Sequence, residues 1–303
     1  MKGRVSFARC AGLVACVLLA ASAQPAFAHH GRHDTNPDQD AALVMEASSG
    51  KVLFARNDDV ERHPASLTKM MTLYIVFEQL RAEKISLTTP IPVSAYAASQ
   101  PKTHLELRAG ETIPVDTAIK AIVVCSANDV AVAVAEAVGG SEPQFATMMN
   151  AEAHALGMSH TFYHNASGLP DNLQITTAGD LAILARHLVY DFPEYFPYFR
   201  TPSMSWDGRD YNTHDYLVES YPGADGIKTG YIDASGYNVV TTALRGNTRL
   251  IGVVMGGVSR ERRDRAMTNM LDDAFAALEA LERTEVSTAP PMLTLTRANQ
   301  PTP

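Results

Sequence analysis

The chain reads Ala65-Ser66-Leu67-Thr68-Lys69-Met70-Met71 at the start of an apolar run that extends to Leu80. Pro64 stands just before this stretch, and proline suits the first turn of a helix. Apolar residues recur at helical spacing through the run, and they also fill most of its other faces. A helix that is apolar on nearly every side is a buried one. We therefore predict a buried helix that begins near Ser66.

Ser66 and Lys69 are three residues apart, which places both side chains on the same helical face. Burial lowers the pKa of a lysine because the charged form loses hydration, and a second cation nearby lowers it further. A neutral Lys69 can take the proton of the Ser66 hydroxyl and make it a nucleophile. Backbone N–H groups at the start of a helix also favour developing negative charge.

The pattern S-x-x-K is weak when taken alone, since it is expected by chance roughly once in a chain of this length. The same chain contains a second match, Ser99-Gln100-Pro101-Lys102, in which the proline would interrupt any helix that holds the pair. The Ser66 match therefore needs support from elsewhere in the sequence.

Ser126-Ala127-Asn128 interrupts an apolar region between two expected helices, at residues 115–124 and 129–138. Both polar side chains can face a cleft there. Ser126 can pass a proton between Lys69 and a leaving amine, and Asn128 can hydrogen-bond a substrate amide. The alternative, which is favoured when this motif is taken alone, is a turn whose polar side chains cap the next helix.

Lys228-Thr229-Gly230 lies at the end of an expected strand. A strand edge can bind an extended peptide through main-chain hydrogen bonds. Lys228 adds a cation that would lower the pKa of Lys69 and attract a carboxylate, while Gly230 allows close approach of the backbone. The alternative is a solvated lysine beside a turn. A K-T-G match is expected by chance in fewer than about one chain in ten, so three such motifs in this order are hard to attribute to accident.

Residues 1–28 have the pattern of a secretory signal: three basic residues, an apolar segment at 11–21 and the small-residue cleavage site Ala26-Phe27-Ala28. A lipoprotein signal at Cys16 is disfavoured because the apolar run continues past it.

Removing the signal removes three positive charges and no negative ones, so the formal charge moves from −8 to −11. Nothing in this composition suggests nucleic-acid binding. Cys125 is the one cysteine left, which excludes an intrachain disulfide. We expect a periplasmic or secreted protein.

We expect a flexible segment at residues 29–37, one domain at 38–282 and a disordered tail, rich in proline and threonine, at 283–303. Strands are expected at 41–46, 51–55, 227–231, 237–244 and 248–255, and further helices at 143–156, 176–190 and 260–281. Residues 90–107 are interpreted mostly as loop and the aromatic stretch 191–205 as core. This order predicts an α/β fold of the α+β type, an antiparallel sheet flanked by helices with an inserted helical subdomain.

The three motifs together resemble those of the serine penicillin-recognising enzymes, which are the penicillin-binding proteins and the serine β-lactamases. Longer stretches at residues 65–72, 156–158, 165–169 and 225–231 narrow the resemblance to the low-molecular-weight serine D-alanyl-D-alanine carboxypeptidases. The resemblance covers about residues 38–282. It implies a fold like that of β-lactamases and transpeptidases, and no metal or organic cofactor.

The resemblance also implies a mechanism. Ser66, with Lys69 as its base, would attack the carbonyl of the penultimate D-alanine of a peptidoglycan stem peptide. Ser126 would help to protonate the leaving D-alanine, and the backbone N–H groups of Ser66 and Tyr231 would form the oxyanion hole. The substrate-binding residues would be Asn128, Lys228, Thr229, Gly230 and Arg263, of which the last is placed only by its position after Met255-Gly256-Gly257. β-Lactam antibiotics would be covalent inhibitors.

Several alternatives use other features of the sequence. A peptidoglycan DD-endopeptidase would use the same catalytic residues and is the main alternative. A β-lactamase is disfavoured because no Glu-x-x-Leu-Asn segment supplies a deacylating carboxylate, and a zinc peptidase because His154, His160 and His164 lack a matching acidic pattern. A wall-binding module that has lost catalysis would require a broken motif, and all three motifs are intact.

We expect no stable membrane anchor, since the segment after the closing helix is short. Tyr231 stands where members of the family often have histidine.

Overall fold

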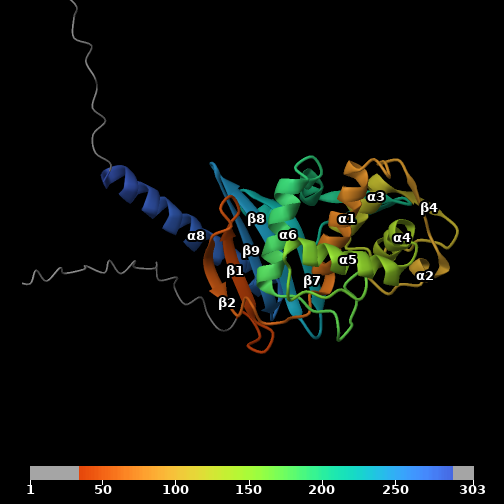
Figure 1. Cartoon of the computed structure of the whole chain (residues 1–303), viewed down its shortest axis with the longest axis horizontal. Helices are drawn as coiled ribbons and strands as arrows, with labels where there is room; N and C mark the ends of the chain where they lie inside the picture. The colour runs from red at the N-terminus through yellow and green to blue at the C-terminus, as the bar shows by residue number, and fades with distance from the viewer. Residues whose placement is uncertain (1–33, 289–303) are drawn as a thin grey trace, which may run out of the picture.

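The computed structural model describes residues 34–288, so the expected signal at residues 1–28 lies outside them. A five-stranded antiparallel sheet forms the centre of the molecule, in the order β2-β1-β9-β8-β7 (Figure 1). Its strands are β1 (Ala41–Glu46), β2 (Val52–Arg56), β7 (Ala224–Ile232), β8 (Gly236–Arg245) and β9 (Thr248–Gly257). Because β1 pairs with β9, strands from both ends of the chain share one sheet, which confirms the predicted α+β architecture.

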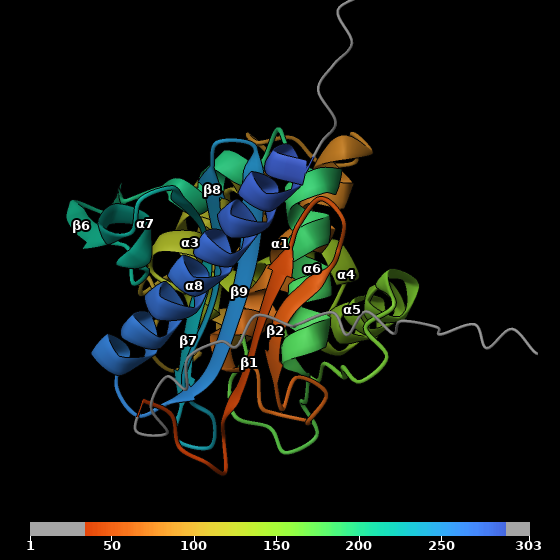
Figure 2. The ribbon, with the colours of Figure 1, turned by 90° about the vertical axis from the view of Figure 1, so that its left-hand side faces the viewer.

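Helices cover both faces of this sheet (Figure 2). The closing helix α8 (Arg260–Thr288) packs on one face and α6 (Ala178–Asp191) on the other. Side chains alternate between the two faces of a strand. Accordingly Val44 of β1 packs in a cluster with residues of α8, whereas Leu43 and Met45 belong to the larger core on the α6 side.

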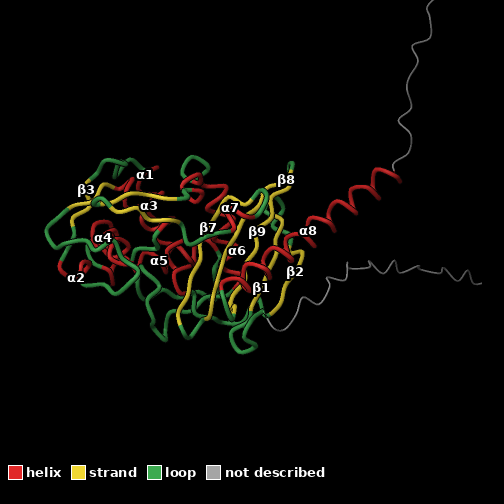
Figure 3. The backbone as a smooth tube through the Cα atoms, turned by 180° about the vertical axis from the view of Figure 1, so that it is seen from behind, coloured by secondary structure: helices red, strands yellow, loops and turns green. Residues whose placement is uncertain are grey.

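The helical subdomain lies at the end of the sheet that β7 forms (Figures 1 and 3). It contains α2 (Ala95–Ala98), α3 (Val115–Val124), α4 (Asn128–Gly139) and α5 (Glu142–Leu156), together with the short pair β3 (Pro90–Pro92) and β4 (Thr112–Pro114). The predicted break between two apolar helices is present, because α3 ends at Val124 and α4 begins at Asn128. The site described below lies where this subdomain meets β7.

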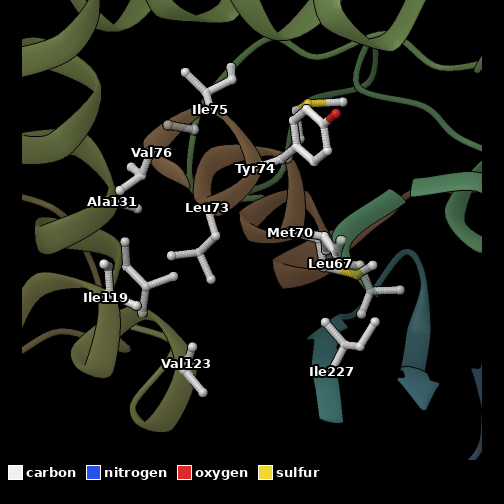
Figure 4. Packing of buried hydrophobic residues seen from close by; sticks show 14 of the residues in the cluster. Leu67, Met70, Leu73, Tyr74, Ile75, Val76, Ile119, Val123, Ala131 and Ile227 are labelled. Atoms are coloured by element: carbon white, nitrogen blue, oxygen red, sulfur yellow. The ribbon is translucent and has the colours of Figure 1, made fainter. Parts of the chain in front are cut away.

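The helix that carries the first motif joins the two parts of the molecule. It begins as a short 3-10 turn, η1 (Ala65–Thr68), and continues as α1 (Lys69–Arg81), of which residues 69–77 are all buried, as predicted. Figure 4 shows Leu67 and Met70 beside Ile227 of β7, while Val76 lies beside Ala131 of α4. Burying each large aliphatic side chain contributes about 1.5–3 kcal/mol, so packing holds this helix in a fixed position between the sheet and the subdomain.

Two predicted boundaries are wrong. Residues 34–37 were expected to be flexible, but Thr35 forms a β-bridge with Gly257 and the amide of Asn36 donates to the carbonyl of Gly256 at 2.7 Å. At the other end, residues 283–288 were expected to be disordered and are the last residues of α8. An ion pair between Arg283 and Glu279, one helical turn apart, supports this extension.

Residues 90–107 are mostly loop, as predicted, but they also contain β3 and α2. The β3–β4 pair is only three residues long on each side, and its central pair, Ile91 opposite Ile113, is buried. Strands this short leave no alternating pattern to detect. The other elements missed from the sequence are η2 (Phe196–Arg200), the hairpin of β5 (Ser203–Trp206) and β6 (Arg209–Asn212), and α7 (Leu217–Ser220). The aromatic residues of 191–205 do pack in the core, as predicted, with Phe192, Phe196 and Phe199 buried.

Candidate active site

The three motifs meet in one cleft of about 470 Å³. It is lined by Ser66 of η1, Ser126 of the α3–α4 turn, Asn128 at the start of α4, and residues 229–231 of β7. Lys69 is completely buried and touches two of these lining residues, Ser66 and Asn128. The structure therefore brings together residues that are more than 160 positions apart in the sequence.

Lys69 has a hydrogen-bond arrangement that suits a base. Its Nζ lies 3.1 Å from Oγ of Ser66 and 2.7 Å from Oδ1 of Asn128, and it also contacts the backbone carbonyl of Ser167. Burial, followed by the charge of Lys228, lowers the pKa of Lys69 far below its usual value. A neutral amine has two hydrogens and one lone pair. The two carbonyl oxygens accept the hydrogens, which leaves the lone pair for the hydroxyl of Ser66.

The Asn128 side chain is held in one orientation. Its Nδ2 donates to the carbonyl of Pro101 at 2.9 Å, so the oxygen Oδ1 must face Lys69. The amide of Asn128 donates to the carbonyl of Thr103 at 2.7 Å. The second hydrogen of Nδ2 is left for a ligand in the cleft.

Ser126 is held in the left-handed region, with φ of 57°. Its Oγ is buried and has no hydrogen-bond partner among residues 34–288. A buried hydroxyl without a partner costs about 1–3 kcal/mol, so this group is available to a molecule bound in the cleft. The alternative interpretation of this motif as a helix cap is wrong, because α4 has Ala127 at its N-cap and no side-chain cap hydrogen bond.

The loop that forms the wall beside Asn128 depends on a residue that the sequence analysis missed. Asp129 is fully buried, and its carboxylate accepts hydrogen bonds from the amides of Leu105 and Leu107 at 3.0–3.1 Å. An acidic residue in the first turn of a helix is favoured by the helix dipole, and this was the one signal available. Asp129 positions residues 101–107, which include the Pro101 carbonyl that orients Asn128.

Replacing Asp129 by alanine is expected to lower the free energy of unfolding by about 2–4 kcal/mol, because the buried amides of Leu105, Leu107 and Val130 lose an acceptor. Urea denaturation followed by circular dichroism measures this change. The matched control is Asp59→Ala, which removes an exposed carboxylate and is expected to change stability by less than about 0.5 kcal/mol. Equal effects of the two substitutions would show that the loop does not depend on Asp129.

Two basic residues are candidates for carboxylate binding, Lys228 of the third motif and Arg263 of α8. Lys228 is 1% exposed and donates to the carbonyl of Thr229 at 2.9 Å, while burial lowers the pKa of its amine to about 8. Arg263, placed from the sequence only by a loose match, lines the cleft and is 2% exposed. It donates to the carbonyl of Asn238 at 3.2 Å and to Asp264 at 2.6 Å. Arg263 is therefore held at the cleft by two hydrogen-bond partners, while Lys228 is buried next to the lining residue Thr229.

Two further titratable residues of this region were missed, because no motif marks them. Burial raises the pKa of Asp215 to about 6, and its Oδ2 has no partner among the residues that the structure describes. His214 lines the cleft, and burial, followed by the charges of Lys228 and Arg260, lowers the pKa of its imidazole to about 4. At neutral pH, Asp215 is thus mainly ionised and His214 is uncharged.

Replacing Asp215 by asparagine is expected to move the alkaline limb of kcat/KM to lower pH by about 0.5–1 unit. The carboxylate of Asp215 raises the pKa of Lys228. Without it, Lys228 loses its proton at lower pH and attracts a substrate carboxylate less strongly above that pH. The measurement is kcat/KM between pH 6 and 10 with a peptide that ends in a free carboxylate. Asp210→Asn, an exposed control, should leave the limb in place, and an unmoved limb in Asp215→Asn would contradict the expectation.

Two glycines let other segments approach Ser66 closely. A Cβ at Gly230 of β7 would lie 2.9 Å from the Ser66 amide nitrogen. A Cβ at Gly168 would lie 1.9 Å from the Ala65 carbonyl oxygen, and its φ of 83° is in the region that favours glycine. The strand that carries the third motif therefore runs directly beside the amide of the candidate nucleophile.

Tyr231 follows Gly230, and its side chain lies on the rim of the cleft. It is 49% exposed, donates its hydroxyl hydrogen to Oδ1 of Asp233 at 2.8 Å and packs its ring 4.4 Å from that of Tyr237. The side chain is therefore held in place although it faces solvent.

Within residues 34–288, no cluster of three or more histidine, cysteine, aspartate or glutamate side chains is placed to hold a metal ion. In the same part of the chain, no helix has both the length and the hydrophobicity needed to cross a bilayer. Cys125 is buried and unpaired, and burial raises the pKa of its thiol to about 12.

Comparison with known proteins places the chain among related sequences. Residues 29–259 match the family model of D-alanyl-D-alanine carboxypeptidases. D-alanyl-D-alanine carboxypeptidase DacF of Bacillus subtilis is 36% identical over 247 residues, which are 79% of this chain and 62% of that protein. DacA of Escherichia coli is 33% identical over 256 residues, 82% of this chain and 64% of that protein. The chain thus spans a little over three fifths of the length of these relatives.

Solved structures give the same result for the fold. Penicillin-binding protein 5 of Haemophilus influenzae superposes with a TM-score of 0.77 at 30% identity, over 81% of this chain and 72% of that one. Penicillin-binding protein D2 of Listeria monocytogenes, in its ampicillin-bound form, has a TM-score of 0.68 at 30% identity, over 78% of this chain and 96% of that one. The motifs, the fold and these matches agree, and the chain belongs to the D-alanyl-D-alanine carboxypeptidase family of penicillin-binding proteins.

Proposed function

We propose that this protein is a serine D-Ala-D-Ala carboxypeptidase, which removes the terminal D-alanine from peptidoglycan stem peptides through an acyl-enzyme on Ser66. The observation that carries the proposal is the environment of Lys69. Its two carbonyl contacts, to Asn128 and Ser167, leave the lone pair of a neutral amine for Oγ of Ser66, 3.1 Å away. The names of the relatives support the same reaction.

In the first step Lys69 takes the proton of Ser66, and Oγ attacks the carbonyl carbon of the penultimate D-alanine. The oxyanion that forms accepts hydrogen bonds from the amides of Ser66 and Tyr231. β7 runs close to the Ser66 amide, and this supports the assignment of the Ser66 and Tyr231 amides as the two donors of one oxyanion hole. When the C–N bond breaks, the unpartnered hydroxyl of Ser126 passes a proton to the leaving amine.

In the second step water attacks the ester carbonyl, which releases the shortened stem peptide and restores the hydroxyl of Ser66. The substrate is held at both ends of the cleft. Lys228, Thr229 and Arg263 bind its terminal carboxylate, and Gly230 lets its backbone approach β7. The free N–H of the Asn128 side chain donates to the carbonyl oxygen of an amide on the acyl side of the substrate.

β-Lactams would acylate the same hydroxyl, since they present a reactive carbonyl and a carboxylate at a similar spacing. Ampicillin- and cefotaxime-bound forms of the Listeria protein support this inference for a relative of similar fold. Neither the proposed steps nor the groups that carry them use a metal or organic cofactor. Peptidoglycan as substrate, with a signal-like N-terminus, supports a periplasmic or secreted location.

Purified muropeptides test the proposed activity. Monomeric pentapeptide should lose one D-alanine, detected as a mass change, with the wild-type protein and not with Ser66→Ala. Cleavage of cross-linked dimers without loss of terminal D-alanine would identify a DD-endopeptidase that uses the same residues. Absence of both products would contradict the proposal.

A further inference from the structure

A buried carboxylate outside the three motifs lies beside the backbone segment that holds Lys69. Glu142 is the first residue of α5, in the helical subdomain (Figure 1), and its side chain is buried. Its Oε1 accepts the amide hydrogen of Ala166 at 3.0 Å, and its Oε2 accepts the hydroxyl hydrogen of Tyr96 in α2 at 2.9 Å. Glutamate is almost never fully buried unless it is paired. Both oxygens of this carboxylate are paired, with groups from two other segments of the chain.

The backbone that Glu142 binds also holds the base. The carbonyl of Ala166 accepts the hydroxyl hydrogen of Thr72 in α1 at 2.7 Å, so both the amide and the carbonyl of residue 166 are fixed. The next carbonyl, that of Ser167, contacts Nζ of Lys69. Ala166 and Ser167 are buried, and a buried backbone group without a partner is costly. The place of the Ser167 carbonyl therefore depends on the two contacts of the residue before it.

Asn165 shapes the same turn from within. Its Oδ1 accepts the amide hydrogens of Ser167 at 3.2 Å and of Gly168 at 2.7 Å. These contacts fix the shape of the turn, whereas Thr72 and Glu142 attach it to the helices α1 and α5. A hydrogen bond to a charged acceptor is roughly twice as strong as one between neutral groups. The bond from the Ala166 amide to Glu142 is therefore the stronger of the two attachments.

The charge of Glu142 also acts on Lys69. Burial, followed by the charge of Lys228, lowers the pKa of Lys69, and the charges of Asp129 and Glu142 oppose this lowering. The three charged neighbours of the amine come from β7, α4 and α5. An amine with a higher pKa is the stronger base once it is neutral. A neutral residue of the same shape in place of Glu142 should therefore weaken the base only slightly, as long as the contact with Ala166 is kept.

We propose that Glu142 is a positioning residue for the general base, which fixes the Ser167 carbonyl against Lys69 and so directs the lone pair of the neutral amine at Oγ of Ser66. Glu142 is not one of the described residues that line the cleft, so it acts without touching the substrate. The inference rests on the proposed function, because it adds a residue that orients Lys69 for the reaction at Ser66.

Two substitutions separate the hydrogen bond of Glu142 from its charge. Glu142→Gln keeps an oxygen that can accept the amide hydrogen of Ala166 and removes the charge. Glu142→Leu removes both the acceptor and the charge and keeps a similar side-chain size. The measurement is the first-order rate constant of acylation by a fluorescent penicillin, together with the dissociation constant of the complex that precedes acylation.

We expect the acylation rate constant to fall at least about 30-fold in Glu142→Leu, because a misplacement of about 1 Å can cost roughly 10²-fold. Glu142→Gln should stay within about threefold of the wild type, since the geometry is kept and the base is only slightly weaker. The dissociation constant should change by less than about twofold in both variants, because an effect on the reacting groups alone does not alter ground-state binding. A loss of rate without a loss of binding is not expected from general destabilisation.

Two controls locate the effect at the contact with Ala166. Tyr96→Phe removes the other partner of the same carboxylate, and Glu194→Leu makes the same change at an exposed position after α6. Both should be acylated at the wild-type rate. All rates are measured where circular dichroism shows the variant to be folded. A folded Glu142→Leu that is acylated at the wild-type rate, or a Glu142→Gln as slow as Glu142→Leu, would overturn the inference.

The proposed function and this inference can fail separately. A wild-type protein that penicillin acylates no more than Ser66→Ala would contradict the proposed function. In that case, crystal structures of the wild type and the two Glu142 variants still test the positioning. The Ser167 carbonyl should contact Lys69 in the wild type and in Glu142→Gln, and it should lie about 1 Å or more away from that position in Glu142→Leu. An unchanged contact in Glu142→Leu would overturn the inference.

Discussion

Replacing Lys69 by methionine is expected to slow acylation of Ser66 by at least about 10³-fold, the size of a lost general base. Methionine fills the buried space but has no lone pair that can take the hydroxyl proton. The carbonyls of Asn128 and Ser167 lose their donor, but methionine also removes the cost of burying an amine, so the free energy of unfolding should fall by no more than about 2 kcal/mol. The measurement is the rate of covalent labelling by a fluorescent penicillin, together with urea denaturation.

Two controls make this result specific. Lys84→Met removes an exposed lysine shortly after the end of α1 and should label at the wild-type rate. Lys69→Arg keeps a positive charge but cannot lose its proton, so it should be as slow as the methionine variant. Labelling of Lys69→Arg at more than about a tenth of the wild-type rate would show that charge is what matters, and it would remove the base from the mechanism.

Replacing Gly168 by alanine is expected to lower the free energy of unfolding by about 3 kcal/mol or more and to reduce acylation strongly. The new Cβ would lie 1.9 Å from the carbonyl oxygen of Ala65, and the φ of 83° disfavours any side chain. Relief requires the residue just before Ser66 to move, which displaces Oγ from Lys69. A misplacement of about 1 Å can cost roughly 10²-fold in rate. Thermal or urea denaturation and penicillin labelling measure the two effects.

Gly157→Ala is the matched control, because Gly157 has nearly the same φ, 85°, and nothing within 4 Å of a Cβ. It should cost only the backbone strain of about 1–2 kcal/mol and leave labelling unchanged. If the two glycine variants lose the same stability and label equally fast, close packing against Ala65 has no part in positioning Ser66.

The central features of the fold could be predicted from the sequence because they leave local patterns. The run after Ser66 is apolar on all faces, and α1 is accordingly buried between β7 and the helical subdomain. Strands expected near both termini are neighbours in one sheet, and the residues of the three motifs lie at one cleft. The spacing of Ser66 and Lys69 within one helical turn already placed both side chains together.

Other features depend on contacts between distant segments and left no such pattern. Asp129 acts on amides more than twenty residues away, and Asp215 affects Lys228 only because the fold buries both. Thr35 lies in a polar stretch whose partner, Gly257, is at the far end of the domain. The end of α8 was misplaced because the composition changes gradually before Pro290, so helix and tail could not be separated at residue 283.

The most direct test is mass spectrometry of the purified protein after incubation with penicillin. The wild-type protein should gain one penicilloyl group, located on the proteolytic peptide that contains Ser66. Ser66→Ala should gain none. An adduct on Ser99 or Ser126, or no adduct on a folded wild-type protein, would contradict the assignment of Ser66 as the nucleophile activated by Lys69.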